Sequence, residues 1–192
     1  EVCKYYSAEG QAAPFERQAL IKLRHIAGDA ALGKKVETHR DSFVYSGAPW
    51  DLTVALDLRR QQVKQLVEPG QINLKHSHGG IVTLEYAIQY LQVMHGHRHP
   101  SLRTPNTLRA LAALIDVGLI PRATGENLRK SYLFIRMLID GLRMVRGNTK
   151  DLVIPPPDSD EFIFLARRVG YQTEDWQAGA RHLQTDIEEH MK

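Results

Sequence analysis

The sequence is short of cysteine and of long apolar runs, and each shortage excludes a class of protein. Cys3 is the single cysteine, so no internal disulfide can stabilise the fold, and a reducing, cytoplasmic location is favoured. No stretch approaches the roughly 18 apolar residues of a membrane span, and the first residues lack the apolar segment of a secretory signal. We therefore expect a protein without disulfides and without a membrane partner.

Charge of one sign is not concentrated either. The 25 Lys and Arg residues outnumber the 22 Asp and Glu residues by three, which gives a formal charge of +3. The basic residues are scattered among acidic ones, as is typical of a solvated surface, and we expect no nucleic-acid partner. The chain starts at Glu1 rather than at methionine, which suggests that it is part of a longer polypeptide.

The alternation of apolar and polar residues that strands require is missing, whereas apolar residues recur every three or four positions. The clearest stripe predicts a helix over about 125–146, with Thr124 as its N-cap. Its members are Leu128, Tyr132, Ile135, Leu138, Leu142 and Val145. We therefore expect an all-α fold, a multi-helix bundle of about seven to eight helices with no significant sheet.

The same spacing, together with turn and cap residues, places the other helices. They are expected over residues 15–27, 30–44, 51–67, 80–96 and 106–117. After the stiff run Pro155–Pro157, Asp158 and Glu161 stand in capping-box spacing and predict a further helix. Thr173 is the expected cap of a last helix near the end of the sequence.

The segment Lys75-His76-Ser77-His78-Gly79-Gly80 lies directly before one of these helices. Two glycines allow the backbone to approach a ligand closely, and free amides at a helix N-terminus favour an anion. Lys75 would neutralise a phosphate group at this position. A flexible loop between helices is the alternative, because a glycine pair before a helix is not a Walker motif.

The residues from Lys75 to Tyr86 resemble the Lys-x-x-x-Gly-Gly-Leu-Val-Asp-Ile-Glu-Phe signature of the glutamine-synthetase adenylyltransferases. Other similar segments occur in the family's order, at residues 15–20, 27–29, 89–92, 100–103, 106–111 and 142–148. The resemblance extends from Phe15 to about Pro155. Thr83 departs from the signature, because the family has aspartate there, whereas Glu85 retains the acid that follows.

The resemblance implies a helical domain behind the nucleotidyltransferase core of an enzyme that attaches AMP from ATP to glutamine synthetase and often removes it. Residues 1–50 would be junction helices from the end of the nucleotidyltransferase region. Residues 51–192 would form the helical bundle domain, packed with the first part as one unit.

The resemblance also implies that Lys75, Gly79, Gly80 and Glu85 lie near the nucleotide cleft of the whole enzyme. In this interpretation Lys75 neutralises phosphate and the glycines permit close backbone approach. Glu85 positions a basic group or the loop itself. If the family's aspartate orients the loop or contacts nucleotide, Thr83 leaves that role unfilled.

The chain lacks the residues that would perform the chemistry. Such transferases hold Mg²⁺ with an Asp-x-Asp pair after a Gly-Ser loop. No Gly-Ser pair occurs, and Asp158-Ser159-Asp160 is better interpreted as a helix-capping cluster. We expect no catalytic residue, metal ligand or cofactor in this chain, which would be inactive alone. ATP, Mg²⁺ and the missing nucleotidyltransferase domain are implied for the whole enzyme.

Two further sets of residues are weaker indications, one of a metal site and one of a surface that contacts a partner. His95, His97 and His99 alternate along the chain, and alternate residues do not share a helix face, so we expect no metal there. A set of basic residues on or just after the longest helix could face the acidic surface of a partner or a nucleotide, or could be solvated or paired with acids. This set is Arg136, Arg143, Arg146 and Lys150.

Two alternative functions stay open. A non-catalytic regulatory or docking module would bind glutamine synthetase or a PII-type signalling protein through its helix faces. The equivalent helical domain of a PII uridylyltransferase is the other alternative. A docking module should bind its protein partner by itself, whereas a cleft wall should respond to nucleotide only when joined to its catalytic half.

Overall fold

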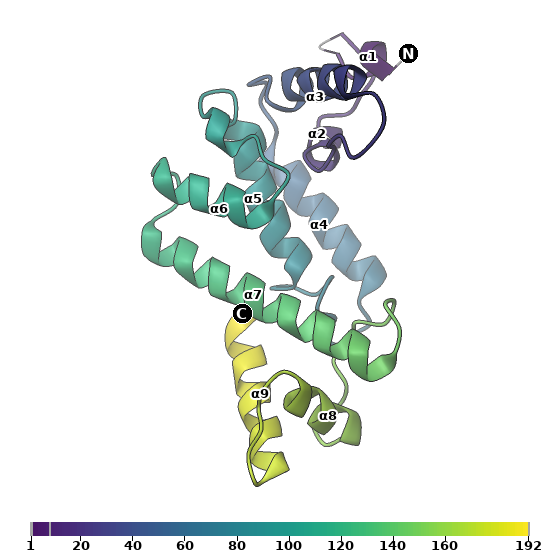
Figure 1. The fold of residues 1–192 in the computed structure, drawn as a ribbon, viewed down its shortest axis with the longest axis vertical. Coiled ribbons are helices and arrows are strands. Elements are labelled where there is room, and N and C mark those ends of the chain that lie inside the picture. Colours follow the sequence, from purple (N-terminus) through teal and green to yellow (C-terminus); the bar gives the residue numbers. More distant parts are fainter. Residues whose placement is uncertain (1, 8, 192) are drawn as a thin grey trace. The chain divides into compact units, whose positions relative to one another are not determined.

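The computed structural model describes residues 2–7 and 9–191. Within these ranges the chain forms nine α-helices and one 3-10 turn, without strands (Figure 1), which confirms the expected all-α fold. The elements are α1 (Val2–Tyr5), α2 (Glu16–Leu20), α3 (Ala30–Val44), α4 (Leu52–Leu66), α5 (Ile81–His95), η1 (Pro100–Leu102), α6 (Thr107–Asp116), α7 (Arg122–Arg146), α8 (Asp160–Arg168) and α9 (Trp176–His190). None of the helices in the described part of the chain combines the length and apolar character needed to cross a bilayer.

The residues form two compact units, each built from two separate stretches of sequence. The first unit takes residues 1–57 and 85–126, and the second takes 58–84 and 127–192. Helices α4, α5 and α7 therefore each contribute residues to both units. The division at residue 50 concerns domains of a longer enzyme and stays a prediction.

The helices begin at polar side chains that accept hydrogen bonds from first-turn amides, which would otherwise have no partner. Asp29 caps α3 by accepting from the amide of Leu32, and Asn106 caps α6 by accepting from that of Arg109. Three expected caps are wrong by one to three residues. Ser159 rather than Asp158 caps α8, Asp175 rather than Thr173 caps α9, and α7 begins at Arg122, before Thr124.

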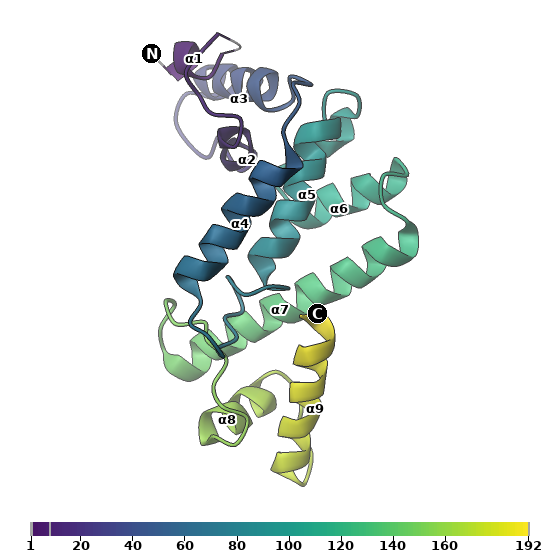
Figure 2. The same ribbon diagram turned by 180° about the vertical axis from the view of Figure 1, so that it is seen from behind.

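Helix α2 is much shorter than the expected helix over 15–27. The backbone after Leu20 forms hydrogen bonds with side chains of another helix instead of continuing α2. The carbonyl of Leu23 accepts from the Arg40 guanidinium, and the amide of His25 donates to Glu37 Oε1 at 2.9 Å. Both partners lie on α3, which runs beside α2 in both views (Figure 2). Side chains of α3 thus form the hydrogen bonds that these backbone groups would otherwise form within a helix.

The first unit has a core that joins segments far apart in sequence. Its buried members are Ile21, Val44, Tyr45, Trp50 and Val93. Tyr90 packs on Trp50 with ring centroids 5.3 Å apart, and its hydroxyl donates to the Trp50 carbonyl. The buried amide of Gln92 donates to the carbonyls of Leu102 and Thr104, so a polar group on α5 fixes the 3-10 turn.

The second unit is centred on the apolar stripe of α7. Ile135, Leu138 and Leu142 are completely buried, as the sequence predicts. Helices α8 and α9 lie side by side (Figure 1) and supply Leu165 and Leu183, which are also completely buried. A short backbone pairing joins the segments before α5 and after α7, because Leu74 donates to Leu152 and Ile154 donates to Ile72.

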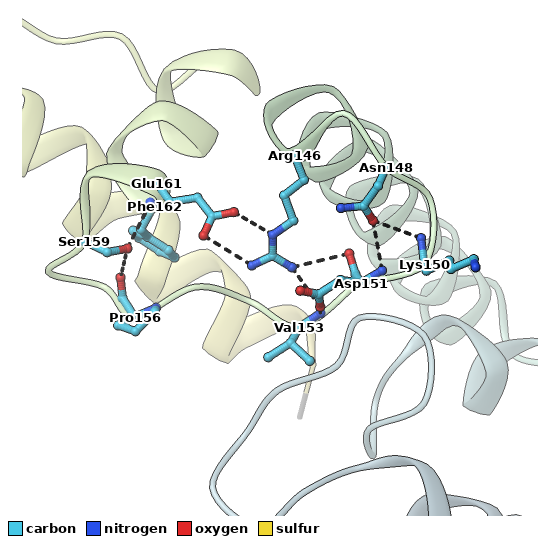
Figure 3. A network of polar contacts seen from close by, with 9 residues as sticks. All are labelled: Arg146, Asn148, Lys150, Asp151, Val153, Pro156, Ser159, Glu161 and Phe162. Carbon is cyan, nitrogen blue, oxygen red and sulfur yellow. Dashed lines mark hydrogen bonds and ion pairs between the residues drawn. The ribbon is translucent and has the colours of Figure 1, made fainter.

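Arg146 is not a solvated residue of α7 but the centre of an ion-pair network (Figure 3). Its side chain is 13% exposed and contacts Glu161 at 2.5 Å and Asp151 at 2.9 Å. Asn148 accepts from the amides of Lys150 and Asp151. The network fixes the turn after α7 against the first turn of α8, so Arg146 is engaged within its own unit.

The cap of α8 gives a first test of the fold. Ser159→Ala removes the oxygen that accepts from the Phe162 amide, and we expect it to lower the free energy of unfolding by about 1 kcal/mol. Asp158→Ala is the matched control, because that exposed neighbour is not the cap and should change the free energy by less than about 0.5 kcal/mol. Urea denaturation measures both; equal losses would contradict the assignment.

Candidate functional site

The segment from Lys75 to Gly80 forms a compact turn that Asn73 and Ser77 organise. Asn73 Oδ1 accepts from the amides of Lys75 and His76, each at 3.0 Å. Ser77 Oγ accepts from the Asn73 amide at 2.8 Å, and the Ser77 amide donates to the Asn73 carbonyl at 2.9 Å. The turn is therefore held together by hydrogen bonds among its own polar groups.

The amides at the start of α5 are already occupied. Those of Gly80, Ile81 and Val82 donate to the carbonyls of Ser77, Leu74 and Lys75, respectively, at 2.9, 3.0 and 3.2 Å. The expectation that this helix entrance presents free amides to an anion is therefore wrong, because the chain folds back and supplies the acceptors. The nucleotide role of Lys75, Gly79, Gly80 and Glu85 stays a prediction, and for Lys75 and Glu85 it depends on their side chains.

Neither Gly79 nor Gly80 has room for a Cβ atom. Gly79 has a φ of +71°, and a Cβ atom there would lie 2.1 Å from the carbonyl oxygen of Met191. A Cβ atom at Gly80 would lie 2.9 Å from the Ser77 carbonyl oxygen. Gly79 is thus in direct backbone contact with the end of α9, and Gly80 allows the turn to close on itself.

Arg59 is the residue of this site that the sequence did not reveal. It lies on α4, is 7% exposed, and its Nη2 contacts three oxygens. These are the His76 carbonyl at 2.7 Å, the Ser77 carbonyl at 3.0 Å and Thr83 Oγ1 at 2.9 Å. The only signal in the sequence is an arginine pair in a predicted helix, which is typical of a surface.

Thr83 contributes to the same cluster. Its hydroxyl accepts from Arg59 and donates to the Ser77 carbonyl at 3.4 Å. The position at which the family signature has aspartate therefore faces a guanidinium. Thr83 is a neutral acceptor for that group, so the turn is held although the carboxylate is absent.

Lys75 lies at the exposed part of the turn. His76 beside it is half-buried, and burial lowers its pKa, as do the nearby charges of Lys75 and Arg59. A lowered pKa keeps the imidazole neutral at pH 7, because its reference value is already about 6.5. Lys75 is the exposed ammonium group of this turn, and its contact with a phosphate stays a prediction.

Glu85 belongs to the first unit, whereas Lys75, Gly79 and Gly80 belong to the second. The turn brings those three together, and Glu85 has partners within its own unit. Its carboxylate lies 3.7 Å from Lys22 Nζ and accepts from the Thr107 hydroxyl at 3.3 Å. Lys22 in turn donates to Thr107 at 2.8 Å. Glu85 is thus paired with a partly exposed lysine, and its role near the nucleotide cleft stays a prediction.

A pocket of about 680 Å³ lies beside the turn within the second unit. Ser77 and His78 form part of its wall, and Val63, Val67 and Ile187 make much of the rest apolar. Its volume falls within the range of small-molecule sites. Among the residues that the structure describes, no three His, Cys, Asp or Glu side chains are grouped as a metal site.

Comparison with known proteins identifies the family. The family model described as GlnD PII-uridylyltransferase matches residues 54–192. A protein of Mycobacterium tuberculosis named bifunctional glutamine synthetase adenylyltransferase/adenylyl-removing enzyme is 36% identical over 157 residues, which are 80% of this chain and 16% of that protein. Proteins with the same name are 30% identical over 90% of the chain in Corynebacterium glutamicum and 35% identical over 70% in Hahella chejuensis.

The chain spans only 14 to 17% of the length of these relatives. The segment that matches the family model includes all of the second unit together with residues 54–57 and 85–126 of the first, and it contains the complete turn from Lys75 to Gly80. The resemblance seen in the sequence is confirmed. The chain therefore belongs to the family that the PII-uridylyltransferase model describes, and its curated relatives are glutamine synthetase adenylyltransferases.

Proposed function

We propose that this chain is the helical domain that forms one wall of the nucleotide and protein-substrate cleft in an enzyme that transfers AMP from ATP to glutamine synthetase. The observation that carries the proposal is the match over most of the chain to relatives named for adding and removing adenylyl groups. The rest of such an enzyme would supply Mg²⁺ and the carboxylates that hold it. The chain alone would be inactive, and a cytoplasmic location fits its single cysteine.

The hydrogen bonds of the turn support a role in this cleft. Arg59 fixes the carbonyls of His76 and Ser77, and Asn73 fixes the amides of Lys75 and His76. The backbone that carries Lys75 is therefore held on both sides, while its side chain points to an exposed surface. A positioned ammonium group neutralises developing charge on a transferring phosphoryl group without reorganisation.

Lys75→Ala in the full-length enzyme tests the phosphate role. Loss of a charge-assisted contact costs about 1.5–3 kcal/mol, so we expect kcat/KM for ATP to fall by about tenfold or more. Lys130→Ala, at an exposed lysine of α7 in the same unit, is the control and should leave kcat/KM unchanged. Adenylylation of glutamine synthetase is the readout; unchanged kinetics of Lys75→Ala would remove the phosphate role.

A PII uridylyltransferase is the second candidate, because the family model that matches the chain carries that name. The two candidates differ in both substrates, since one uses ATP and glutamine synthetase and the other UTP and a PII-type protein. Offering the full-length enzyme each nucleotide with each acceptor distinguishes them. Binding of glutamine synthetase or a PII-type protein by the isolated chain, without nucleotide, would instead favour a docking module.

A further inference from the structure

Arg17 carries a positive charge that is buried without a carboxylate partner among the described residues. The residue lies in α2 and is 3% exposed. Among residues 2–7 and 9–191 its guanidinium donates to backbone carbonyls alone, from Nε to Pro14 at 3.2 Å, from Nη1 to Ala48 at 2.7 Å and from Nη2 to Pro49 at 3.0 Å. Buried charges are usually paired with an opposite charge, so this arrangement is unusual.

The physical cause of the shifted pKa of Arg17 agrees with that contact pattern. Burial lowers its pKa, and within the described part of the chain no carboxylate opposes the effect. Glu16, its neighbour in sequence, is engaged elsewhere, because Glu16 Oε1 accepts from the Tyr5 hydroxyl and the Ala13 amide, each at 2.9 Å. An arginine stays protonated in proteins, so Arg17 is a buried cation that no carboxylate of the described residues neutralises.

A pocket of about 600 Å³ adjoins the guanidinium, and all of its lining residues belong to the first unit. Besides Arg17, its wall contains the serines Ser7, Ser42 and Ser46 and the turn residue Gly47. Acidic residues are absent from the described lining. The volume is within the range of sites for small molecules.

The donors around this pocket suit an oxyanion. Nη1 and Nη2 each carry a second hydrogen beyond the one donated to Ala48 or Pro49, so each can donate once more to an oxyanion. Ser46 Oγ accepts from the Ala48 amide at 3.4 Å, and its hydroxyl hydrogen can point toward a ligand. The Ser42 hydroxyl donates to the Thr38 carbonyl and can rotate to a stronger acceptor.

We propose that the pocket at Arg17 binds a phosphate group, either free or carried by a small molecule, and that this group is the missing counter-ion of the buried guanidinium. The pocket wall has hydroxyl donors and no described carboxylate, which favours a tetrahedral anion with more than one charge. The planar guanidinium of Arg17 cannot contact all oxygens of such an anion, and the serine hydroxyls can contact the others. The proposal concerns other residues than the turn at Lys75, so it does not depend on the proposed function.

Titration calorimetry of the chain with inorganic phosphate and with AMP, at constant ionic strength set by chloride, tests the proposal. The decisive variant is Ser42→Asp, which places a carboxylate in the pocket wall without removing any hydrogen bond of Arg17. We expect saturable phosphate binding in the unmodified chain and at least a tenfold weaker affinity in Ser42→Asp, because like charges repel at short range. AMP binding tighter than phosphate would show that the group is carried by a nucleotide.

Ser101→Asp is the matched control, since it adds the same charge at another exposed serine of the first unit. Phosphate affinity should be unchanged in this variant. Arg17→Gln removes the charge and should also abolish binding, while circular dichroism checks that it folds; if it does not fold, Ser42→Asp decides alone. Absence of saturable binding in the unmodified chain, or equal weakening by Ser42→Asp and Ser101→Asp, would overturn the proposal.

Discussion

Gly79→Ala is expected to lower the free energy of unfolding by about 3 kcal/mol, because it combines two unfavourable effects. A non-glycine residue in the left-handed region costs roughly 1–2 kcal/mol, and Gly79 has a φ of +71°. The added Cβ atom would also lie 2.1 Å from the Met191 carbonyl oxygen and 2.8 Å from its Cα atom. Backbone cannot rotate away as a flexible side chain can, so the end of α9 or the turn must move.

Gly70→Ala separates the two effects. Gly70 belongs to the same unit and has a similar φ of +80°, but a Cβ atom there meets nothing within 4 Å. The control should therefore show only the conformational cost of about 1–2 kcal/mol. Urea denaturation followed by circular dichroism measures both variants. Equal losses would mean that the contact between Gly79 and Met191 does not constrain the turn.

Arg59→Ala is expected to destabilise the protein by about 3 kcal/mol, since it leaves buried acceptors without their charged donor. The carbonyls of His76 and Ser77 and the Thr83 hydroxyl would all lose a hydrogen bond from Nη2. Gln65→Ala is the control on the same helix, because Gln65 is exposed. Chemical denaturation measures the free energy of unfolding of both variants. A loss no larger than that of Gln65→Ala would mean that Arg59 does not hold the turn.

Thr83→Asp tests the same contact from the side of the acceptor. It introduces the residue that the family signature has at this position and faces Arg59 with a carboxylate instead of a hydroxyl. Charge-assisted hydrogen bonds are about twice as strong as neutral ones, so the variant should be at least as stable as the original chain. In an Arg59→Ala background the same substitution should instead destabilise, because the new carboxylate would have lost that donor.

Local patterns in the sequence predicted the helices well where one face is buried. Ile135, Leu138 and Leu142 recur at helical spacing, and all three are completely buried. The caps were harder, because several polar residues precede each helix and backbone conformation selects among them. Ser159 and Asp175 both adopt extended backbone angles and accept first-turn amides, and composition does not distinguish them from their neighbours.

The contacts of the buried arginines could not be predicted in the same way. Arg59 and Arg17 donate to backbone carbonyls that lie 17 and 31 residues away, and a carbonyl is present at every residue. No pattern of side-chain types marks such an acceptor. The motif at Lys75 was visible because its glycines and lysine are unusual together, whereas the arginine that fixes it resembles any exposed residue of an amphipathic helix.

The interleaved course of the chain has a consequence for how it can be divided. The second unit needs residues 58–84 and also residues 127–192, while the stretch between them completes the first unit. A single cut anywhere from 58 to 126 therefore deprives at least one unit of part of its chain. During synthesis on the ribosome, residues 58–84 would emerge long before their packing partners and wait with apolar side chains exposed. The first unit is complete once residue 126 has been made, before residues 127–192 follow. The first unit would therefore fold before the second.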